Sequence, residues 1–248
     1  MNIFLLGCNG NLGKYIADNL SKDFNNKVIG IDIHNSYQGN SKNITYFEID
    51  FLSKGITSQI KNLILSCEET NCFVNLIAKD YPVGSNDLCK NSPFELNLDE
   101  ICKSYKVTLG SSYLLIQNLL KLKNSKFHIL LIGSIYSRNL PNLNNYSEDQ
   151  SLYKPVAYSL SKAAQNILFK ETCRTVSTKN FRINMITFGG VNTNLDDKFI
   201  EKYSSQVPLN RMVSPKDVVD CIKWLLLDSP EIVNGSEFLV DGGWSLAN

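Results

Sequence analysis

Short apolar runs alternate with longer segments of mixed polarity from one end of the chain to the other. A short apolar run between polar or glycine-rich positions is typical of a strand buried on both faces, whereas apolar residues three or four positions apart indicate one side of a helix. Strands are predicted at residues 2–6, 27–31, 44–49, 72–78, 127–132, 182–186 and 237–240. Helices are predicted at residues 14–20, 58–68, 98–122, 156–178 and 215–227. This alternation predicts an α/β chain with about seven parallel strands covered by helices.

Nothing in the chain marks a boundary between domains. Its 248 residues are enough for one large α/β domain, and no linker, repeat or low-complexity tract interrupts the pattern. We therefore read residues 1–248 as a single domain. Two connections, 80–97 and 135–154, are unusually long. Because they follow the carboxyl ends of parallel strands, we expect them to form functional lids and not merely disordered loops.

Composition excludes several classes of protein. The formal net charge is +1, with 43% hydrophobic and 20% charged residues, so neither nucleic acid nor an anionic membrane surface is an expected partner. The richest apolar stretch, Leu114–Leu122, contains Gln117, Asn118 and Lys121 and is too polar to span a membrane. No charged region precedes the short N-terminal apolar run, so no signal peptide is expected.

The seven cysteines are scattered, and their odd number does not fit a disulfide framework. Cys67 and Cys72 form a pair without a partner cluster or a nearby histidine, which favours small buried residues over metal ligands. His34 and His128 have no evident catalytic partner, which argues against histidine-based or zinc-based chemistry. We expect a cytoplasmic, reduced protein without a metal.

A glycine-rich turn, Gly7-x-x-Gly10-x-x-Gly13, lies between the first predicted strand and the first predicted helix. Glycines in such a turn let the backbone approach a pyrophosphate, which then faces the helix N-terminus. The spacing differs from the GxGxxG fingerprint, so by itself it also fits a plain strand-to-helix turn. The second predicted strand ends at Asp32, whose carboxylate suits the ribose hydroxyls of NAD and repels the extra phosphate of NADP. No Arg or Lys occurs between Asp32 and Ser41, so NAD is favoured over NADP.

Tyr158 and Lys162 are the most informative pair of residues. Positions four apart share one face of a helix, so both side chains can reach one substrate. An ammonium group beside a phenol favours the phenolate and brings the pKa of the tyrosine closer to working pH, where it can exchange protons. Such a pair can also simply line a helix, and the glycine-rich turn is what favours a catalytic role.

Several motifs occur in a fixed order along the chain. They are Gly7-x-x-Gly10-x-x-Gly13, Asp32, Asn75, Ser134, Tyr158-x-x-x-Lys162, Gly189-Gly-Val-x-Thr193, Pro208-Leu-Asn-Arg-Met212 and Val240-Asp-Gly-Gly-Trp244. Together they resemble the short-chain dehydrogenase/reductase superfamily over the whole chain, and the length and C-terminal motif are those of its compact branch. The glycine spacing and the long interval from Ser134 to Tyr158 lean toward sugar-nucleotide epimerases and dehydratases. Gly133-Ser-Ile-Tyr136 and Lys154-Pro-Val-Ala-Tyr158 are similar to a bacterial subgroup that accompanies flagellin glycosylation and nonulosonate-type sugar pathways.

The resemblance implies a Rossmann-like, doubly wound parallel sheet with helices on both faces. It also implies that Tyr158 is the general acid/base, that Lys162 lowers the pKa of Tyr158 and holds the nicotinamide ribose, and that Ser134 bonds the reacting oxygen. The implied cofactor-binding residues are Gly7, Asn9, Gly10, Asn11, Leu12, Gly13, Asp32, Ile33, Asp50, Phe51, Asn75, Ala78, Tyr158, Lys162, Val191 and Thr193. Simpler readings remain open for three of these residues: Ser134 as a loop cap, Asp50 as a strand end and Asn75 as a turn residue.

Three positions depart from the pattern of the superfamily. Thr108 stands where many members have an Asn that helps to hold a water beside the catalytic lysine, so Thr108 is assigned to the proton relay as a partial substitute. Ala78 replaces a glycine and leaves less room at the cofactor, and Phe188 replaces a proline before Gly189.

The leading hypothesis is an NAD-dependent oxidoreductase that interconverts an alcohol and a ketone, with a sugar or sugar derivative as substrate. The loop tyrosines Tyr136, Tyr146 and Tyr153 could bind a polyol, or could simply pack. One alternative is a 3-oxoacyl-carrier-protein or general ketone reductase, which usually prefers NADP. Another is a catalytically weak nucleotide-binding regulatory or scaffold protein.

The resemblance also implies a homodimer or homotetramer built from the long helix and the Tyr158 helix. The small and apolar residues available for this are Ser111, Ser112, Leu115, Leu119, Ala164, Ile167 and Leu168. The same residues could instead pack on the sheet.

Overall fold

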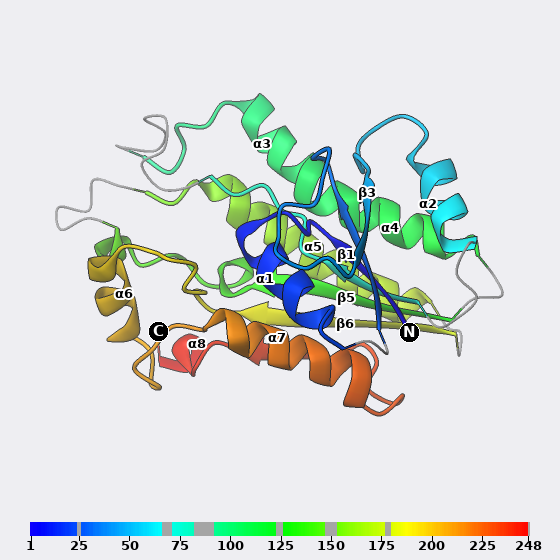
Figure 1. Ribbon diagram of the computed structural model, residues 1–248. Coiled ribbons are helices and arrows are strands. Elements are labelled where there is room, and N and C mark those ends of the chain that lie inside the picture. The colour runs from blue at the N-terminus through cyan, green and yellow to red at the C-terminus, as the bar shows by residue number, and fades with distance from the viewer. Residues whose placement is uncertain are drawn as a thin grey trace.

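A computed structural model describes residues 1–23, 26–65, 71–81, 92–122, 126–146, 153–176 and 180–247 of the chain. Its centre is a sheet of seven strands, all paired in parallel, in the order β3-β2-β1-β4-β5-β6-β7. The strands are β1 (Asn2–Leu6), β2 (Lys27–Asp32), β3 (Ile44–Glu48), β4 (Asn71–Asn75), β5 (Phe127–Ser134), β6 (Phe181–Phe188) and β7 (Glu237–Val240). The predicted doubly wound α/β fold is therefore confirmed (Figure 1).

The strand order reverses at β1, which lies between β2 and β4. Leu6 at the end of β1 is opposite Ile31 on one side and Asn75 on the other. At such a switch point the connections leave the neighbouring strands in opposite directions, which opens a crevice at the carboxyl ends of the strands. The glycine-rich turn follows β1 directly, so it borders this crevice.

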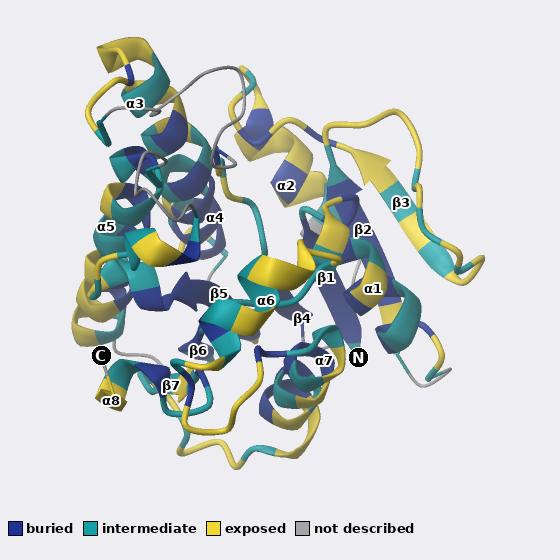
Figure 2. Cartoon of the chain, turned by 90° about the vertical axis from the view of Figure 1, so that its left-hand side faces the viewer, coloured by how far each residue is buried: buried dark blue, intermediate teal, exposed yellow. Residues whose placement is uncertain are grey.

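Helices cover both faces of the sheet (Figures 1 and 2). They are α1 (Asn11–Leu20), α2 (Ile56–Leu65), α3 (Leu98–Tyr105), α4 (Ser111–Leu119), α5 (Val156–Thr175), α6 (Asp197–Ser204), α7 (Pro215–Lys223) and α8 (Trp244–Ala247). One face packs on α1 and α7, and the other on α2, α4 and α5. Among the described residues, no helix has the length and apolar character needed to cross a membrane.

Alternation along each strand explains why there are two cores. In β1, Ile3 and Leu5 belong to the core under α1 and α7, whereas Phe4 and Leu6 belong to the core under α2, α4 and α5. Successive side chains of a strand point to opposite faces, so a continuous apolar run is required where both faces are buried. The burial of β1, β4 and β5 on both faces follows directly from the apolar runs in the sequence.

The helix expected over residues 98–122 is interrupted. A π-helical turn, Lys106–Gly110, separates α3 from α4 and contains the buried Thr108. The Thr108 carbonyl oxygen accepts hydrogen bonds from the hydroxyls of Ser111 and Ser112, at 3.3 and 3.2 Å. Such side-chain bonds compete with the regular helix pattern, and π turns often occur beside functional sites.

Other expected boundaries also differ from the structure. The helix expected over 215–227 loses its regular α geometry at Lys223 and continues as a π-helical turn, Trp224–Asp228. The strand expected over 72–78 ends at Asn75, whose side-chain oxygen accepts a bond from the Ile77 backbone N–H at 3.0 Å. Cys72 is buried as expected, whereas Cys67 lies outside the described residues.

Four residues expected to form a subunit interface instead pack inside the chain. Ser111, Ser112, Leu115 and Leu119 of α4 are buried. On α5, Ile167 is exposed. The reading in which the small and apolar face of α4 packs on the sheet is thus correct for α4.

Candidate active site

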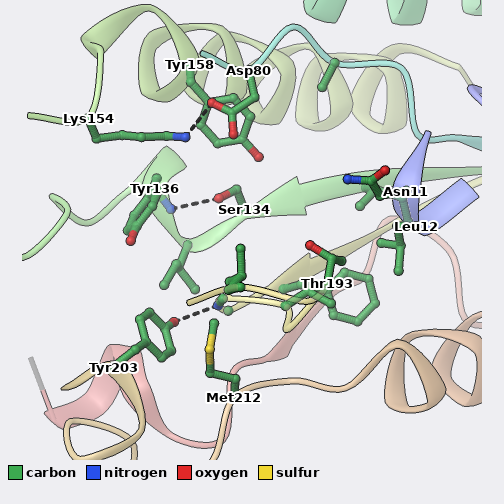
Figure 3. A pocket seen from close by; sticks show the side chains of 18 of the residues that line it. Asn11, Leu12, Asp80, Ser134, Tyr136, Lys154, Tyr158, Thr193, Tyr203 and Met212 are labelled. Carbon is green, nitrogen blue, oxygen red and sulfur yellow. Dashed lines mark hydrogen bonds and ion pairs between the residues drawn. The ribbon is translucent and has the colours of Figure 1, made fainter. Parts of the chain in front are cut away.

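A pocket of about 1010 Å³ opens at the carboxyl ends of the strands. It is bordered by the glycine-rich turn, the end of β5, the start of α5, the segment after β6, and α6. The expected site residues that line it are Gly7, Gly10, Asn11, Leu12, Gly13, Ala78, Ser134, Tyr158, Lys162, Val191 and Thr193. The fold thus brings motifs that are far apart in the sequence, from the glycine-rich turn to Thr193, into one cavity (Figure 3).

The glycine-rich turn has a geometry that only glycine tolerates at two positions. Gly7 has a φ of +83°, which L side chains rarely adopt. A Cβ at Gly13 would overlap the carbonyl oxygen of Gly7. Gly10 meets only that same oxygen, at 3.4 Å, and lines the pocket just before α1 begins at Asn11. The close backbone and the helix N-terminus fit the pyrophosphate of a dinucleotide.

Asp32 is held beside this turn by three donors. Its carboxylate accepts bonds from the backbone N–H groups of Asn9 and Ile33, both at 2.8 Å, and pairs with His34 Nδ1 at 2.9 Å. The bond from Asn9 ties the end of β2 to the glycine-rich turn. Asp32 therefore has a fixed orientation, although it does not line the pocket itself.

Several expected cofactor-binding residues do not line the pocket. The Asn9 amide bonds the backbone of Ser36 and Gln38, and the Asn75 amide bonds Ser112 and the Ile77 N–H. The Asn9 side chain therefore stabilises the loop after β2. The Asn75 side chain holds the turn at Ile77, as the turn-residue interpretation expected, and also bonds Ser112 in the core.

The remaining three lie near the ends of β2 and β3. Ile33 is exposed, Asp50 accepts a bond from the Leu52 backbone N–H at 2.8 Å, and Phe51 is buried in the core. Their part in cofactor binding stays a prediction.

Ser134, Tyr158 and Lys162 converge at the centre of the pocket. Ser134 ends β5, and its hydroxyl accepts a bond from the Tyr136 backbone N–H at 3.2 Å. Lys162 lies one helical turn after Tyr158 on α5, with its Nζ 5.9 Å from the centre of the Tyr158 ring. This arrangement places a hydroxyl, a phenol and an ammonium group around one point at which a substrate oxygen could bind.

Tyr158 does not show the lowered pKa expected from its lysine neighbour. Burial raises the pKa of Tyr158 above its usual value, and the Asp80 carboxylate raises it further, while the Ser134 hydroxyl acts in the opposite direction. Desolvation of the phenolate is thus the largest influence on the pKa of Tyr158. Burial also lowers the pKa of Lys162 to about 8, against a raising effect of Asp80.

A buried chain of hydrogen bonds holds Lys162. Its ammonium donates to the carbonyl oxygen of Ile132 at 2.7 Å and to Gln165 Oε1 at 3.1 Å. Gln165 Nε2 donates to Ser112 Oγ at 2.8 Å, and Ser112 Oγ donates to the carbonyl oxygen of Thr108 at 3.2 Å. All of these side chains are buried.

Thr108 has no direct hydrogen bond to Lys162, and its part in the proton relay stays a prediction. Its hydroxyl accepts a bond from the Lys79 backbone N–H at 3.0 Å, and Thr108 connects to Lys162 only through Ser112 and Gln165 among the described residues. The acceptor beside the lysine is Gln165. The sequence signal for Gln165 was a polar residue three positions after Lys162, on the buried side of the same helix.

An ion pair lies over the Tyr158 ring (Figure 3). Lys154 Nζ is 2.5 Å from Asp80 Oδ1 and 5.2 Å from the centre of that ring. Both charged residues line the pocket and were missed by sequence reasoning. The available signals were a carboxylate shortly after β4 and a lysine four positions before Tyr158.

Two of the three loop tyrosines reach the pocket. Tyr136 and Tyr146 line it, and their hydroxyls are 3.3 Å apart. Tyr153 instead packs against the buried cluster of Tyr81, Leu96 and Ala157. The interpretation as a packing residue is therefore correct for Tyr153.

Phe188, which stands where many members of the superfamily have a proline, also lines the pocket.

Comparison with known families gives a match over most of the chain. A family model described as enoyl-(acyl carrier protein) reductase matches residues 56–245. The chain is also 29% identical over 259 aligned positions to the post-translational flagellin modification protein A of Campylobacter coli, covering 98% of each protein.

Solved structures agree on the fold. A short chain dehydrogenase from Leptospira borgpetersenii with bound NAD⁺ is similar at a TM-score of 0.78 and 24% identity, over 98% of this chain and 92% of that one. A 4-hydroxyisoleucine dehydrogenase complexed with NADH and succinate has a TM-score of 0.80 at 22% identity, over 98% and 99% of the two chains.

Proposed function

Because this chain belongs to the short-chain dehydrogenase/reductase superfamily and is an oxidoreductase of CH–OH groups, we propose that it uses NAD to interconvert an alcohol and a ketone on a sugar or sugar derivative. One observation carries the proposal: Ser134, Tyr158 and Lys162 share a pocket with the glycine-rich turn. A bound dinucleotide could then reach from that turn to the reacting oxygen.

The residues divide the chemistry between them. A bound nicotinamide supplies the hydride acceptor or donor, and hydride transfer carries both electrons to or from the substrate carbon. In the direction of reduction, Ser134 donates a hydrogen bond to the carbonyl oxygen, and Tyr158 gives that oxygen its proton. The raised pKa of Tyr158 keeps it protonated at neutral pH, which suits an acid. Lys162 places a positive charge beside the phenolate that remains.

Asp32 supports NAD as the cofactor. Its carboxylate is fixed by the Asn9 and Ile33 N–H groups and by His34, so it cannot easily turn away from a ribose bound at the end of β2. A 2′-phosphate at that place would meet this negative charge. NADH in the 4-hydroxyisoleucine dehydrogenase and NAD⁺ in the Leptospira dehydrogenase agree with this choice.

The substrate class rests on two supports. The similarity to a flagellin modification protein over 98% of both chains agrees with the subgroup of flagellin glycosylation and nonulosonate-type sugar pathways. Tyr136 and Tyr146 add two hydroxyl groups to the pocket wall, where a polyol could bond them.

We also propose that the protein is cytoplasmic and forms a homodimer or homotetramer that includes α5. The described cysteines are free thiols, which agrees with a reducing compartment. Ile167 and Leu160 are exposed on α5, with 64% and 42% of their surface accessible, and offer an apolar contact. Sedimentation of the purified protein tests the assembly.

Calorimetric titration with NAD(H) and NADP(H) tests the cofactor. We expect NAD(H) to bind and Asp32→Ala to weaken that binding, whereas Asp220→Ala, which removes an exposed carboxylate on α7, leaves it unchanged. If neither NAD(H) nor NADP(H) binds, the proposed function is refuted. NADH formation from sugar and nucleotide-sugar alcohols then tests the reaction, while a preference for NADPH with 3-oxoacyl thioesters would favour the carrier-protein reductase alternative.

A further inference from the structure

We propose that the Asp80–Lys154 ion pair is a substrate-binding element, which selects a compound carrying a hydroxyl group next to the reacting carbon. This inference rests on the proposed function and specifies the substrate class for the same site.

The position of the pair in the fold supports this role. Asp80 lies five residues after the end of β4, and Lys154 lies just before α5 begins at Val156. The two come together over the ring of Tyr158, and both line the pocket (Figure 3). A substrate whose oxygen meets the Tyr158 hydroxyl therefore has this pair beside it.

The two partners are not equally accessible. The Lys154 side chain is only 10% exposed, and its ammonium also lies 3.5 Å from the carbonyl oxygen of Tyr81. The Asp80 side chain is 47% exposed, and only its Oδ1 bonds Lys154. Among the described residues Oδ2 has no hydrogen-bond partner, so the lysine anchors a carboxylate whose second oxygen can accept a bond from a ligand.

The charge of Asp80 decides which ligands are compatible. An ionised carboxylate only accepts hydrogen bonds, so it matches a hydroxyl donor. An alkyl chain in that place would strip water from the carboxylate without replacing the lost bonds, and an anionic group would be repelled. Sites built to bond a hydroxyl reject analogues that lack it far more strongly than apolar pockets reject an added hydroxyl.

Two further hydroxyl groups line the same pocket. The hydroxyls of Tyr136 and Tyr146 are within 3.3 Å of each other and can each donate or accept. A compound with hydroxyls on several adjacent carbons could bond Asp80 on one side and these tyrosines on the other. A 3-oxoacyl chain offers no such set of donors.

The test compares cyclic alcohols on the same six-membered ring that carry one, two or six hydroxyls. With saturating NAD⁺, kcat/KM is measured for cyclohexanol, cis-1,2-cyclohexanediol and myo-inositol, using wild type, Asp80→Asn and Lys154→Met. We expect wild type to prefer the hydroxylated substrates, and Asp80→Asn to reduce that preference about tenfold or more. The lost charge also acts on Tyr158 and Lys162, but this effect is common to the three alcohols and cancels in the ratio of their kcat/KM values. Asp220→Asn is the matched control, because it breaks another Lys–Asp pair of 2.5 Å that lies on the surface of α7.

The outcomes separate this inference from the proposed function. Equal turnover of the three alcohols, or an equal loss for all of them in Asp80→Asn, overturns the inference and leaves the oxidoreductase assignment in place. If the wild-type protein fails to bind NAD(H) in calorimetry, the proposed function is refuted, and this inference is refuted with it. Thermal melting and NAD⁺ binding of each variant show whether the fold is kept.

Discussion

The Lys162 ammonium donates a 3.1 Å hydrogen bond to the side-chain oxygen of Gln165, one turn further along α5. The bond gives the buried lysine a polar acceptor within its own helix. Because Gln165 is in turn fixed by Ser112, the lysine is positioned by α4 as well as by α5.

Replacing Gln165 should change the pH dependence of catalysis. Burial lowers the pKa of Lys162 to about 8, while Asp80 opposes this and the Gln165 oxygen solvates the charged form. The lysine must be protonated to stabilise the phenolate, so activity is present below its pKa and lost as pH rises through it. In Gln165→Leu we expect the alkaline limb of kcat/KM to move to lower pH, by about one unit for a lost hydrogen bond to a charged group.

Gln165→Glu supplies the contrast for that prediction. It keeps an acceptor and adds a negative charge beside the ammonium, so the alkaline limb should move to higher pH. If both variants lowered kcat/KM equally at every pH, Gln165 would have only a structural role.

Tyr158→Phe should separate binding from chemistry. It removes the acid/base hydroxyl but keeps the ring under Lys154, which lies 5.2 Å from the ring centre. We expect kcat to fall by about 10²–10⁴-fold, as for other general acids and bases, with NAD(H) affinity nearly unchanged. Stopped-flow NADH absorbance and calorimetry measure the two effects. Retention of normal kcat would exclude Tyr158 as the proton donor.

Two alanine substitutions in the glycine-rich turn should have different effects. Gly13→Ala places a Cβ against the Gly7 carbonyl oxygen, so we expect a loss of about 1–3 kcal/mol in the free energy of unfolding. A Cβ added at Gly10 would lie 3.4 Å from the same Gly7 oxygen, which is an ordinary contact, so the free energy of unfolding should hardly change. Because Gly10 lines the pocket, Gly10→Ala should still weaken NAD(H) binding. Urea unfolding and calorimetry of the two variants test this contrast, and similar stabilities would contradict it.

His128 should make the protein sensitive to acid. It is buried in β5, within 3.0 Å of the Asn184 amide, and burial, with a smaller effect of Arg182, lowers its pKa to about 3. In the unfolded chain the pKa of His128 is about 6.5, so below that pH the unfolded state binds a proton that the folded state does not. The contribution of neutral His128 to the free energy of unfolding is complete above about pH 6.5. It decreases by about 1.4 kcal/mol per pH unit as the pH falls toward 3.

His128→Leu should therefore flatten the acid side of the stability curve. Asn184 keeps a bond to the Val233 carbonyl oxygen at 2.9 Å, so the substitution leaves its amide partly satisfied. An identical acid slope in wild type and His128→Leu would show that other groups cause the loss.

The strands could be predicted because each apolar run is a local feature of the sequence. Each apolar run that was expected to be a strand forms one, and Asp32 and Ser134 lie at strand ends as expected. The interruption of the helix over 98–122 could not be predicted in this way. It coincides with bonds from Ser111 and Ser112 to the Thr108 carbonyl oxygen and with the contact between Thr108 and Lys79, and the second of these exists only in the folded chain.

The site could be predicted in part for the same reason. Tyr158 and Lys162 share one helix, so their spacing alone places them together. Asp80 and Lys154 are separated by 74 positions, and their pairing depends on how β4 and α5 meet. Gln165 was close to Lys162 in sequence, yet its role follows from Ser112 on another helix.

The parallel pairing of the whole sheet also affects how the pocket is assembled during folding. None of the seven described strands pairs with the next one through a tight hairpin, since parallel neighbours require a crossover connection. The pairing of β1 with β4 brings Asn2 beside Asn71, across all of β2, β3 and α2. Such non-local contacts form slowly, because the long intervening chain must be closed before the contact stabilises it. We therefore expect the dinucleotide cleft at this seam to appear late in refolding, after much of the helical signal has returned.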